Sequence, residues 1–277
     1  MVNSSKSHTV ADLRRALSRG LIACTAGIAL ASLQVAGCAG LSVHDTATSP
    51  VPERAAVPQR GPATLNFAGF EWTTRYSAEP TAPGGNTFSS SMDDIWVDEQ
   101  GRLHLSVGEH ATEVRSRRPL GYGSYEARIL ARLDRLDPQV VFGFFTFELP
   151  SEHPYHREID IEVSRWGNPD MTNMQFSVQP SNVLENRHRF ELQQNGEATT
   201  HRFTWTPERV EFVSWHGHGE YPPPPELEVA RFVVEGSVVP RPARARAYFN
   251  FWRYQGLPLQ EASREKIIIS DFRFTPY

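Results

Sequence analysis

The stretch His156-Arg-Glu-Ile-Asp-Ile-Glu-Val163 decides how the rest of the sequence is interpreted. Acidic and apolar residues alternate strictly along it, which predicts a β-strand, because successive side chains of a strand point to opposite faces. Glu158, Asp160 and Glu162 then share one face, and the apolar residues between them share the other. These residues alone leave one alternative open, an amphipathic strand with a solvated acidic face.

The spacing of the two glutamates suits acid–base chemistry. At about 3.3 Å per residue, their α-carbons lie about 13 Å apart with Asp160 between them. Two long side chains that lean toward a common atom can bring their carboxyl groups to the ~5–5.5 Å that a retaining glycosidase needs. Neighbouring carboxylates repel one another, so we expect at least one to stay protonated near neutral pH and to provide an acid beside a base.

Residues 1–37 predict a secretory signal rather than part of the fold. Three arginines precede the apolar run 21–35, and small residues then lead to a cysteine. Val35-Ala-Gly-Cys38 resembles the lipobox of bacterial lipoproteins, in which the cysteine becomes the lipidated N-terminus. An ordinary signal peptide or a transmembrane anchor is the alternative, but the run is short for a membrane span. Because Ala39 resembles the residue found in lipoproteins of the outer membrane, we expect an exported protein, anchored to the bacterial cell envelope there through lipid on Cys38.

Composition excludes several classes of function. The only cysteines are Cys24 and Cys38, so the mature chain is expected to have no disulfide bond. The formal net charge of the sequence is −4; without residues 1–37, which hold four basic residues and one acidic residue, 24 basic residues remain against 31 acidic ones, a net charge of −7. This balance argues against nucleic acid as a partner. No later stretch is apolar enough to span a bilayer, so we expect membrane contact through the lipid anchor only.

Three segments follow from the sequence pattern. Residues 1–37 form the signal, and residues 38–63, which are rich in Ala, Ser, Thr and Pro, form the lipidated cysteine and a flexible tether. Such a tether spans roughly 25–30 Å as a random coil. Residues 64–277 contain no comparable break and no obvious repeat, so we expect them to be one all-β catalytic domain that works as a monomer.

The strand signals within this domain are short. Val140–Phe147 is aromatic and β-branched, as expected for a strand that is buried on both faces. Two packed antiparallel sheets, in a sandwich or jelly roll, are the simplest arrangement of such strands. Besides the acidic stretch, the other expected strands cover residues 102–107, 121–130, 171–178, 201–205, 209–215, 246–252 and 266–274.

An ordered series of motifs resembles glycoside hydrolase family 16. The resemblance covers essentially Phe67 to the C-terminus, and the unbulged E-x-D-x-E pattern is similar to that of the lichenases and the xyloglucan-active members. It makes the solvated acidic strand a poor explanation. The motifs are Gly121-Tyr-Gly-Ser-Tyr-Glu-Ala-Arg128, Phe144-Phe-Thr-Phe147, Glu158-Ile-Asp-Ile-Glu162, Gln175-Phe176, His201-Arg-Phe-Thr-Trp-Thr-Pro207, Asn250-Phe-Trp252 and Ser270-Asp-Phe-Arg-Phe274.

The resemblance implies a concanavalin A-like β-sandwich jelly roll, with two curved antiparallel sheets and a concave substrate groove. It also implies endo-acting hydrolysis of a β-linked glucan-type polysaccharide, with retention of anomeric configuration by double displacement. By position, Glu158 resembles the nucleophile and Glu162 the general acid/base. Asp160 resembles the residue that hydrogen-bonds the nucleophile.

The resemblance also implies residues that bind the substrate: Glu113, Arg115, Phe147, Gln175 and Trp252. A surface ion pair is the alternative for Glu113 and Arg115, and plain core packing is the alternative for Trp252.

The sequence departs from the lichenases at two positions. His156 stands where they usually have Trp, and Ser177 stands where they have Asn after Gln-Phe. We expect both changes to affect sugar contacts rather than the carboxylates, which leaves the preferred glucan open. The stiff loop Tyr221–Pro225 is expected to cap one end of the groove.

We expect no cofactor and no metal site. Asp271 lies where some family members bind a structural calcium ion, but one carboxylate with backbone carbonyls is too little to predict a site. His216-Gly-His218 lacks a third ligand at a suitable spacing and is interpreted as a loop.

Two alternatives to hydrolysis remain open. A transglycosylase would use the same carboxylates, with a sugar hydroxyl in place of water. A glycan-binding envelope lipoprotein would keep the sandwich without catalysis. The intact carboxylate triplet argues against this second alternative, because a lectin has no use for a protonated acid in its groove; the fold alone would not decide.

Overall fold

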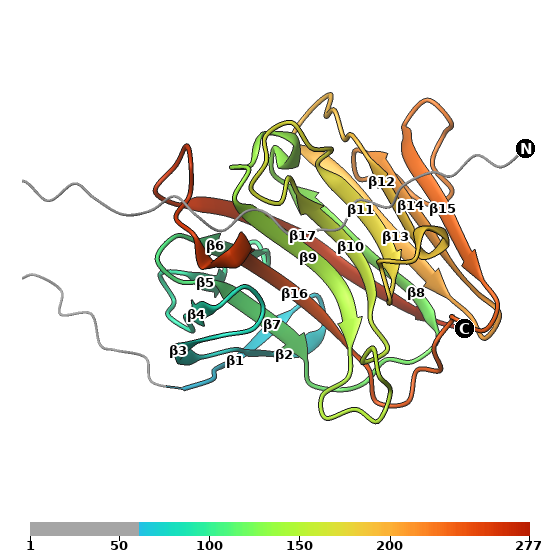
Figure 1. Cartoon of the computed structure of the whole chain (residues 1–277), viewed down its shortest axis with the longest axis horizontal. Helices are drawn as coiled ribbons and strands as arrows, with labels where there is room; N and C mark the ends of the chain where they lie inside the picture. Colours follow the sequence, from blue (N-terminus) through green and yellow to red (C-terminus); the bar gives the residue numbers. More distant parts are fainter. Residues whose placement is uncertain (1–60) are drawn as a thin grey trace, which may run out of the picture. The chain divides into compact units, whose positions relative to one another are not determined.

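The computed structural model describes residues 61–277, and these form two packed antiparallel sheets (Figure 1). The predicted signal 1–37, Cys38 and most of the tether 38–63 lie outside the described residues, so these three assignments stay predictions. Within residues 61–277, no helix is long and apolar enough to cross a membrane.

The first sheet has eight strands in the order β1-β2-β7-β16-β9-β10-β11-β12. Its strands are β1 (Thr64–Phe67), β2 (Phe70–Thr74), β7 (Thr112–Ser116), β16 (Arg246–Arg253), β9 (Val140–Phe147), β10 (Ile159–Ser164), β11 (Met174–Val178) and β12 (Arg187–Phe190).

The second sheet has seven strands in the order β15-β14-β13-β8-β17-β6-β5. Its strands are β15 (Glu228–Glu235), β14 (Arg209–His216), β13 (Ala198–Trp205), β8 (Gly123–Leu130), β17 (Glu265–Pro276), β6 (Leu103–Val107) and β5 (Ile95–Val97). The remaining elements are the hairpin β3 (Ser77–Thr81) and β4 (Asn86–Phe88), and the 3₁₀ turns η1 (Leu133–Arg135), η2 (Leu184–Asn186) and η3 (Tyr254–Gly256).

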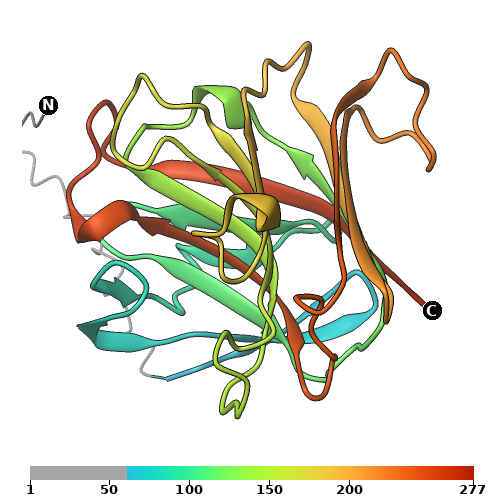
Figure 2. The ribbon, with the colours of Figure 1, turned by 45° about the vertical axis from the view of Figure 1, so that its right-hand side comes forward.

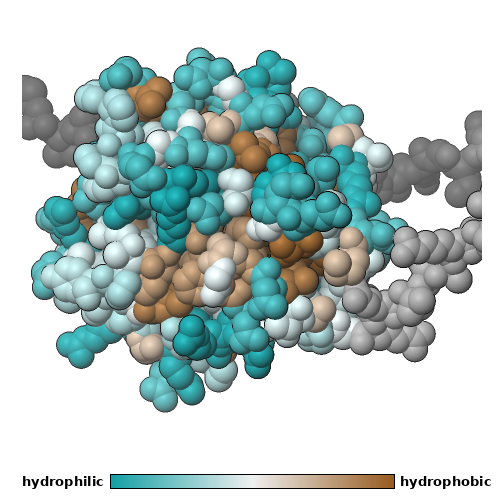
Figure 3. Space-filling view, turned by 180° about the vertical axis from the view of Figure 1, so that it is seen from behind, coloured by the Kyte–Doolittle hydropathy of each residue, from teal (hydrophilic) through white to brown (hydrophobic). Residues whose placement is uncertain are grey.

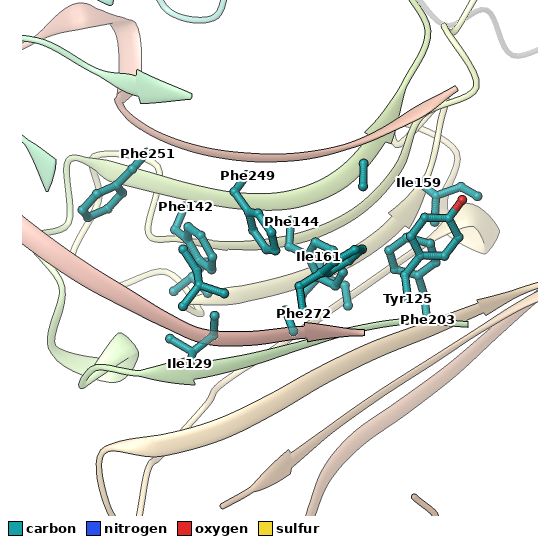
Figure 4. Packing of buried hydrophobic residues seen from close by; sticks show 14 of the residues in the cluster. Tyr125, Ile129, Phe142, Phe144, Ile159, Ile161, Phe203, Phe249, Phe251 and Phe272 are labelled. Atoms are coloured by element: carbon teal, nitrogen blue, oxygen red, sulfur yellow. The ribbon is translucent and has the colours of Figure 1, made fainter. Parts of the chain in front are cut away.

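The core lies between the two sheets and is dominated by aromatic rings (Figure 4). Phe144 of β9 stacks on Phe249 of β16 at 4.9 Å between ring centroids, and it meets Phe203 of β13 in the other sheet at 5.4 Å. Each such pair adds about 0.5–1.5 kcal/mol beyond its buried area. Along β16, Phe249 and Phe251 therefore point into the core, and their neighbours Asn250 and Trp252 point to the opposite face.

The structure confirms the predicted strand Val140–Phe147 as β9, and the other predicted strands, apart from the acidic one, match observed strands to within three residues. The acidic strand begins at Ile159 instead of His156. His156 and Arg157 have φ of 51° and 57°, which belongs to a turn and not to a strand. The sequence analysis missed β1 to β5, β7, β12 and β15, which are short or lie at or near sheet edges.

The expectation that Tyr221–Pro225 caps the groove is wrong. Tyr221 packs against Trp215 of β14, with ring centroids 6.3 Å apart, and lies under the guanidinium of Arg202 of β13 at 4.0 Å. Both strands belong to the second sheet, and these side chains lie on its outer face. Figure 2 shows the orange loop at the ends of β14 and β15. The prolines therefore stiffen a loop that covers the second sheet.

Candidate active site

A cavity of about 620 Å³ lies on the outer face of the eight-stranded sheet, which we call the groove face. Strands β2, β7, β9, β10 and β16 and the segments around them line it. The structure brings most of the predicted site residues together on the wall of this cavity: Glu113, Arg115, Phe147, Glu158, Asp160, Glu162 and Trp252.

Strand β10 places its acidic side chains by simple alternation. Its apolar residues Ile159, Ile161 and Val163 are at most 2% exposed and pack in the core. Asp160 and Glu162 consequently point to the groove face, as the sequence predicted.

Glu158 lies one residue before β10, at the end of a turn that is fixed from both sides. Its carbonyl oxygen accepts a hydrogen bond from the backbone N–H of Gln179 at 3.1 Å. In the turn before it, Arg157 forms an ion pair with Glu148 at 2.6 Å. His156 stacks on Phe147, with centroids 4.6 Å apart and an interplanar angle of 15°. These contacts hold the Glu158 carboxyl against the cavity.

Asp160 lies at the centre of a hydrogen-bond network. Its Oδ2 accepts hydrogen bonds from Ser177 Oγ at 3.0 Å and from Gln179 Nε2 at 3.1 Å, and it shares a side-chain hydrogen bond with Glu158. The expectation that Ser177 affects only sugar contacts is therefore wrong, since the serine touches the central carboxyl. Burial raises the pKa of Asp160 to about 6, although these hydrogen bonds oppose the shift.

Glu162 is the strongest candidate for an acid at neutral pH. Burial and the charge of Asp160 raise the pKa of Glu162 to about 8. Its Oε2 accepts a hydrogen bond from Gln175 Nε2 at 2.9 Å, so Gln175 acts on a carboxyl from the neighbouring strand and does not line the cavity. Burial and the charges of Asp160 and Glu162 also raise the pKa of Glu158 well above its usual value. The triplet thus holds at least one proton near neutral pH, on Glu162, as the sequence analysis expected.

Gly143 of β9 keeps the floor of the cavity open. It is the register partner of Glu162 on one side and of Asn250 on the other. A Cβ at Gly143 would lie 2.6 Å from Asn250 Oδ1, so a side chain does not fit. Within residues 61–277, Asn250 Oδ1 is buried and has no hydrogen-bond partner. A free acceptor and an open space therefore lie beside the catalytic candidates.

Glu113 and Arg115 lie on the groove face because Val114 between them is buried in the core. Their pairing differs from the surface ion pair considered as the alternative. Glu113 pairs with Arg75 at 3.3 Å, and burial raises the pKa of Glu113. Arg115 shares a side-chain hydrogen bond with Tyr248.

Trp252 lines the cavity, but its side chain is only 8% exposed. It packs in a small cluster with Phe88 and Val141. The β3–β4 hairpin covers it closely, since a Cβ at Gly84 would lie 2.7 Å from its ring. Core packing, the alternative raised for Trp252, therefore describes most of this residue, and only its edge reaches the cavity.

The sequence analysis missed three residues of the site: Arg75, Gln179 and Tyr248. Tyr248 stacks on Phe145 at 5.1 Å and lines the cavity. The alternation of Tyr248, Asn250 and Trp252 along one strand was a signal that places all three on one face. Arg75 and Gln179 carry no comparable local signal.

A comparison with known protein families found a match for the central part of the chain. Residues 83–214, which include β10 and the cavity floor, match the family model of glycosyl hydrolases family 16. This part of the chain is thus similar in sequence to the glycosyl hydrolases of family 16. A β-glucanase of Acetivibrio thermocellus is 30% identical over 134 residues, which are 47% of this chain and 37% of that protein. The chain thus spans well under half the length of this curated relative.

Solved structures show the same fold at low sequence identity. The β-glucanase of Bacillus licheniformis has a TM-score of 0.57 and 18% identity, and the alignment covers 79% of this chain and all of that one. An immunostimulatory antigen and pseudo β-1,3-glucanase of Mycobacterium tuberculosis has a TM-score of 0.55 and 16% identity, with 74% and 91% covered. These similarities show that the described domain has the jelly-roll fold, with two curved antiparallel sheets, that the sequence predicted.

The surroundings of Asp271 do not fit the calcium ion found in some family 16 members. Asp271 Oδ2 accepts a hydrogen bond from Arg273 Nε at 2.8 Å, and the same guanidinium pairs with Glu220 at 3.3 Å. A calcium ion would have to compete with this fixed positive charge. Residues 61–277 contain no group of three or more His, Cys, Asp or Glu side chains that is arranged to hold a metal ion.

Proposed function

We propose that this chain is an endo-acting glycoside hydrolase that cleaves β-linked glucan-type polysaccharide with retention of configuration. The observation that carries the proposal is the carboxyl triplet Glu158, Asp160 and Glu162 on the wall of the cavity, with a pKa of about 8 at Glu162. A carboxyl that stays protonated beside others that ionise earlier supplies an acid and a nucleophile in one site. The β-glucanases among the relatives support glucan as the substrate class.

In the first step, the Glu158 carboxylate attacks the anomeric carbon as Glu162 donates its proton to the glycosidic oxygen. The bond from the anomeric carbon to that oxygen breaks, and a glycosyl ester forms on Glu158. Glu158 must be ionised when it attacks. Its hydrogen bond with Asp160 supplies the route, because the proton that the two carboxyls share passes to Asp160.

In the second step, the ionised Glu162 takes a proton from water, and the hydroxide attacks the anomeric carbon. The ester bond breaks, Glu158 leaves as a carboxylate, and Glu162 is again protonated for the next cycle. Two inversions at the same carbon give net retention. Gln175 holds the Glu162 carboxyl in place throughout by its hydrogen bond at 2.9 Å.

The layout of the groove face supports the proposal of endo action. Strands β9, β16 and β7 extend from β10 on one side, and β11 and β12 extend on the other. A chain of sugars therefore has surface to bind on both sides of the carboxyls. Exposed Leu149 and partly exposed Phe147 add apolar surface at the cavity, which suits the apolar faces of sugar rings. We also propose that the chain acts as a monomer.

A panel of polysaccharides tests the proposal. The chain is incubated with β-1,3, β-1,4 and mixed-linkage glucans, xyloglucan and galactan, and reducing ends and product sizes are followed. We expect new reducing ends and short products from at least one β-glucan, and none with Glu158→Gln. Glu126→Gln, which changes a carboxylate on the second sheet, serves as the matched control and should behave as wild type. Products longer than the substrate would show transglycosylation instead, and no reaction with any β-glucan would overturn the proposal.

We also propose that the protein is exported and held at the bacterial outer membrane by lipid on Cys38. The motif Val35-Ala-Gly-Cys38 supports this, and stable anchoring needs two or more acyl chains, which lipoprotein processing supplies. Mass spectrometry of protein from membranes should find acyl chains on the N-terminal Cys38, and Cys38→Ser should abolish them. Unmodified protein in the membrane fraction would contradict the anchor.

Figure 3 shows the face of the molecule opposite to that in Figure 1, where a band of hydrophobic residues crosses a mostly hydrophilic surface. The described residues thus carry apolar surface in patches, which is the form that contacts with sugar rings or other macromolecules require.

A further inference from the structure

Two arginines of β12 lie on the groove face beside the carboxyl triplet. Strand β12 pairs with β11 so that Arg189 is opposite Gln175 and Arg187 is opposite Ser177. Directly paired residues of antiparallel strands point to the same face. Gln175 and Ser177 bind Glu162 and Asp160, so both arginine side chains share the face of the carboxyls. Two strand spacings, about 10 Å, separate β12 from β10.

The other residues of β12 agree with this orientation. His188 packs toward the core, where its ring lies 5.5 Å from Phe232 of β15. Phe190 lies 4.8 Å from the core residue Phe176. Alternation along the strand then leaves the two arginines on the groove face.

Neither arginine has an anionic partner among the described residues; the guanidinium of Arg189 lies over the ring of Trp166, at 5.9 Å from its centroid. Within residues 61–277, no carboxylate forms an ion pair with Arg187 or Arg189. Arg189 donates one hydrogen bond, from Nη2 to the carbonyl oxygen of Thr172 at 3.1 Å. Its Nε is buried without any partner. A buried donor of a charged group that lacks an acceptor is unfavourable, so this arrangement favours an acceptor from outside the chain.

The charges around the pair support the same conclusion. Burial and the neighbouring charge of Arg187 lower the pKa of Arg189, so the two cations repel each other, and only Glu162 opposes this. Glu191, two residues after Arg189, is already paired with Arg165 at 2.5 Å, and Glu185, two residues before Arg187, forms no ion pair with either arginine in the described domain. Two like charges held together without an anion form a ready site for an oxyanion.

A purely internal role does not account for both residues. Arg189 could act on Glu162 by its charge, but Gln175 lies between their strands and makes the hydrogen bond to that carboxyl. Arg187 is paired in register with Ser177, and Asp160 receives its hydrogen bonds from Ser177 and Gln179. The guanidinium groups thus remain free to bind a ligand that lies across β11 and β12.

We propose that Arg187 and Arg189 bind an anionic substituent, a carboxylate or a sulfate ester, on the sugar units that lie over β11 and β12. This deepens the proposed function, on which it rests: the substrate is an acidic polysaccharide, bound by cations on the side of the carboxyl triplet opposite the cavity. A guanidinium presents two parallel N–H groups to the two oxygens of such a group. The cavity side, where Glu113 and Arg75 neutralise each other, receives neutral sugars.

Binding and hydrolysis on matched polymers test this proposal. Mixed-linkage β-glucan is compared with its carboxylated and its sulfated derivatives at equal degrees of substitution. Affinity is measured on the chain with Glu158→Gln, so that the polymers stay intact. At low ionic strength we expect an affinity for one or both anionic polymers about tenfold higher than for the neutral one, because close charge pairs add that much to complexes. Arg187→Gln with Arg189→Gln should reduce this ratio to about one.

Controls separate recognition from general charge and from structure. Arg118 and Arg135 are exposed and form no ion pair within the described domain, so Arg118→Gln with Arg135→Gln removes the same charge elsewhere and should leave the ratio unchanged. Arg187→Gln alone leaves the buried Arg189 in place and should lower the ratio partly, which keeps the test valid if the double variant does not fold. A preference confined to the carboxylated polymer identifies uronic acids, and one confined to the sulfated polymer identifies sulfate esters.

Three results would overturn the proposal: equal affinity for neutral and anionic polymers, a ratio that the control pair also abolishes, or losses from the β12 variants that are equal on all polymers. Reducing ends, measured with the chain carrying its native Glu158, report on the proposed function separately. Arginine-dependent binding of an anionic polymer without any hydrolysis would support this inference and overturn the hydrolase. Hydrolysis of neutral glucan with no preference for anionic polymers would support the hydrolase and overturn this inference.

Discussion

Carboxyl groups on the outer faces of the two sheets differ in whether they form ion pairs. On the second sheet, Glu126 of β8 lies 3.2 Å from Arg128 and 3.5 Å from Arg202, so its charge is compensated. On the groove face, the triplet Glu158–Glu162 holds three carboxyls that form no ion pair within residues 61–277. Their partners are amide and hydroxyl groups and one another.

The difference shows that the carboxyls of the groove face lack stabilising ion pairs, and that this lack suits them to acid–base chemistry. Burial without a cation disfavours the charged form of a carboxyl and raises its pKa, whereas a neighbouring guanidinium has the opposite effect. Glu220, which hydrogen-bonds Arg128 and Arg273, has a lowered pKa, while the pKa of Glu162 rises to about 8. The second sheet thus carries carboxylates suited to solubility, and the groove face carries carboxyls that hold protons and cost stability.

The largest expected effect is the loss of turnover when a glutamate of the triplet is removed. Glu158→Ala and Glu162→Ala should each lower turnover at least ~10³-fold, or about 4 kcal/mol of barrier, while Glu126→Ala leaves turnover unchanged. Added azide separates the two roles. With Glu158 removed, azide attacks from the vacated face and gives the inverted glycosyl azide; with Glu162 removed, a substrate with a good leaving group still forms the ester, and azide gives the retained product.

NMR of the azide products reads the two configurations. The same anomer from both variants would overturn the assignment of nucleophile and acid/base. Full activity of Glu158→Ala would overturn the catalytic role of the triplet altogether, and the difference between the sheets would then have no link to function.

The next prediction concerns the packing that offsets the cost of the buried carboxyls. Trp252→Ala should destabilise the fold by about 3 kcal/mol, because a buried aromatic side chain leaves a cavity. For a domain of this size the loss corresponds to roughly 6–12 °C in Tm. Phe147→Ala, at a more exposed ring that lines the same cavity, is the matched comparison and should cost less. Thermal unfolding measures both, and a Trp252 variant as stable as wild type would show that the indole serves sugar binding alone.

The sequence predicted the chemistry of the groove face better than its surroundings. Alternation determines which side of a strand a residue takes, so the order of residues 158–162 was enough to place Glu158, Asp160 and Glu162 together. It cannot predict what covers that side. Trp252 is buried by Gly84, which lies far away in sequence, and Glu113 pairs with Arg75 across 38 positions.

Short edge strands and turns were the other sources of error. Strand β12 has four residues, of which two are arginines, too few for its alternation to stand out in the sequence. The acidic strand was drawn too long at its start because nothing in His156 or Arg157 signals a positive φ, which non-glycine residues rarely adopt. Contacts with residues outside the turn explain why it forms there, among them the ion pair of Arg157 with Glu148 and the stacking of His156 on Phe147.

A third prediction sharpens the comparison within the triplet. Asp160→Asn should reduce turnover by about 10²-fold, less than either glutamate variant, because it removes the proton acceptor for Glu158 but no reacting atom. Ser177→Ala, which deletes one hydrogen bond to Asp160, should cost about tenfold or less. Steady-state rates on the best glucan measure both. A loss from Ser177→Ala that equals that from Asp160→Asn would show that the serine, and not the carboxyl, controls proton placement.

The last prediction concerns stability as a function of pH. Carboxyls on the two sheets should change stability in opposite directions as the pH rises. The pKa of Glu162 is about 8 in the folded chain against 4.5 for an ordinary glutamate, so the folded state holds a proton that the unfolded state releases. This contribution to stability is fully present below pH 4.5 and is lost as the pH rises toward 8. Glu162→Gln cannot ionise, so this variant does not lose stability in that way as the pH rises. Its Tm relative to wild type should therefore rise steadily from pH 4 to pH 8.

Glu220→Gln supplies the opposite case on the second sheet. Because Arg128 and Arg273 lower the pKa of Glu220, its stabilising contribution is present above pH 4.5 and is lost as the pH falls below that value. Removing it should slightly destabilise the protein at pH 7 and leave stability unchanged in strong acid. Differential scanning calorimetry at a series of pH values measures both variants against wild type. If the Glu162→Gln curve runs parallel to that of wild type from pH 4 to pH 8, Glu162 is ionised like a surface carboxylate, and the outer faces of the two sheets do not differ in how they hold protons.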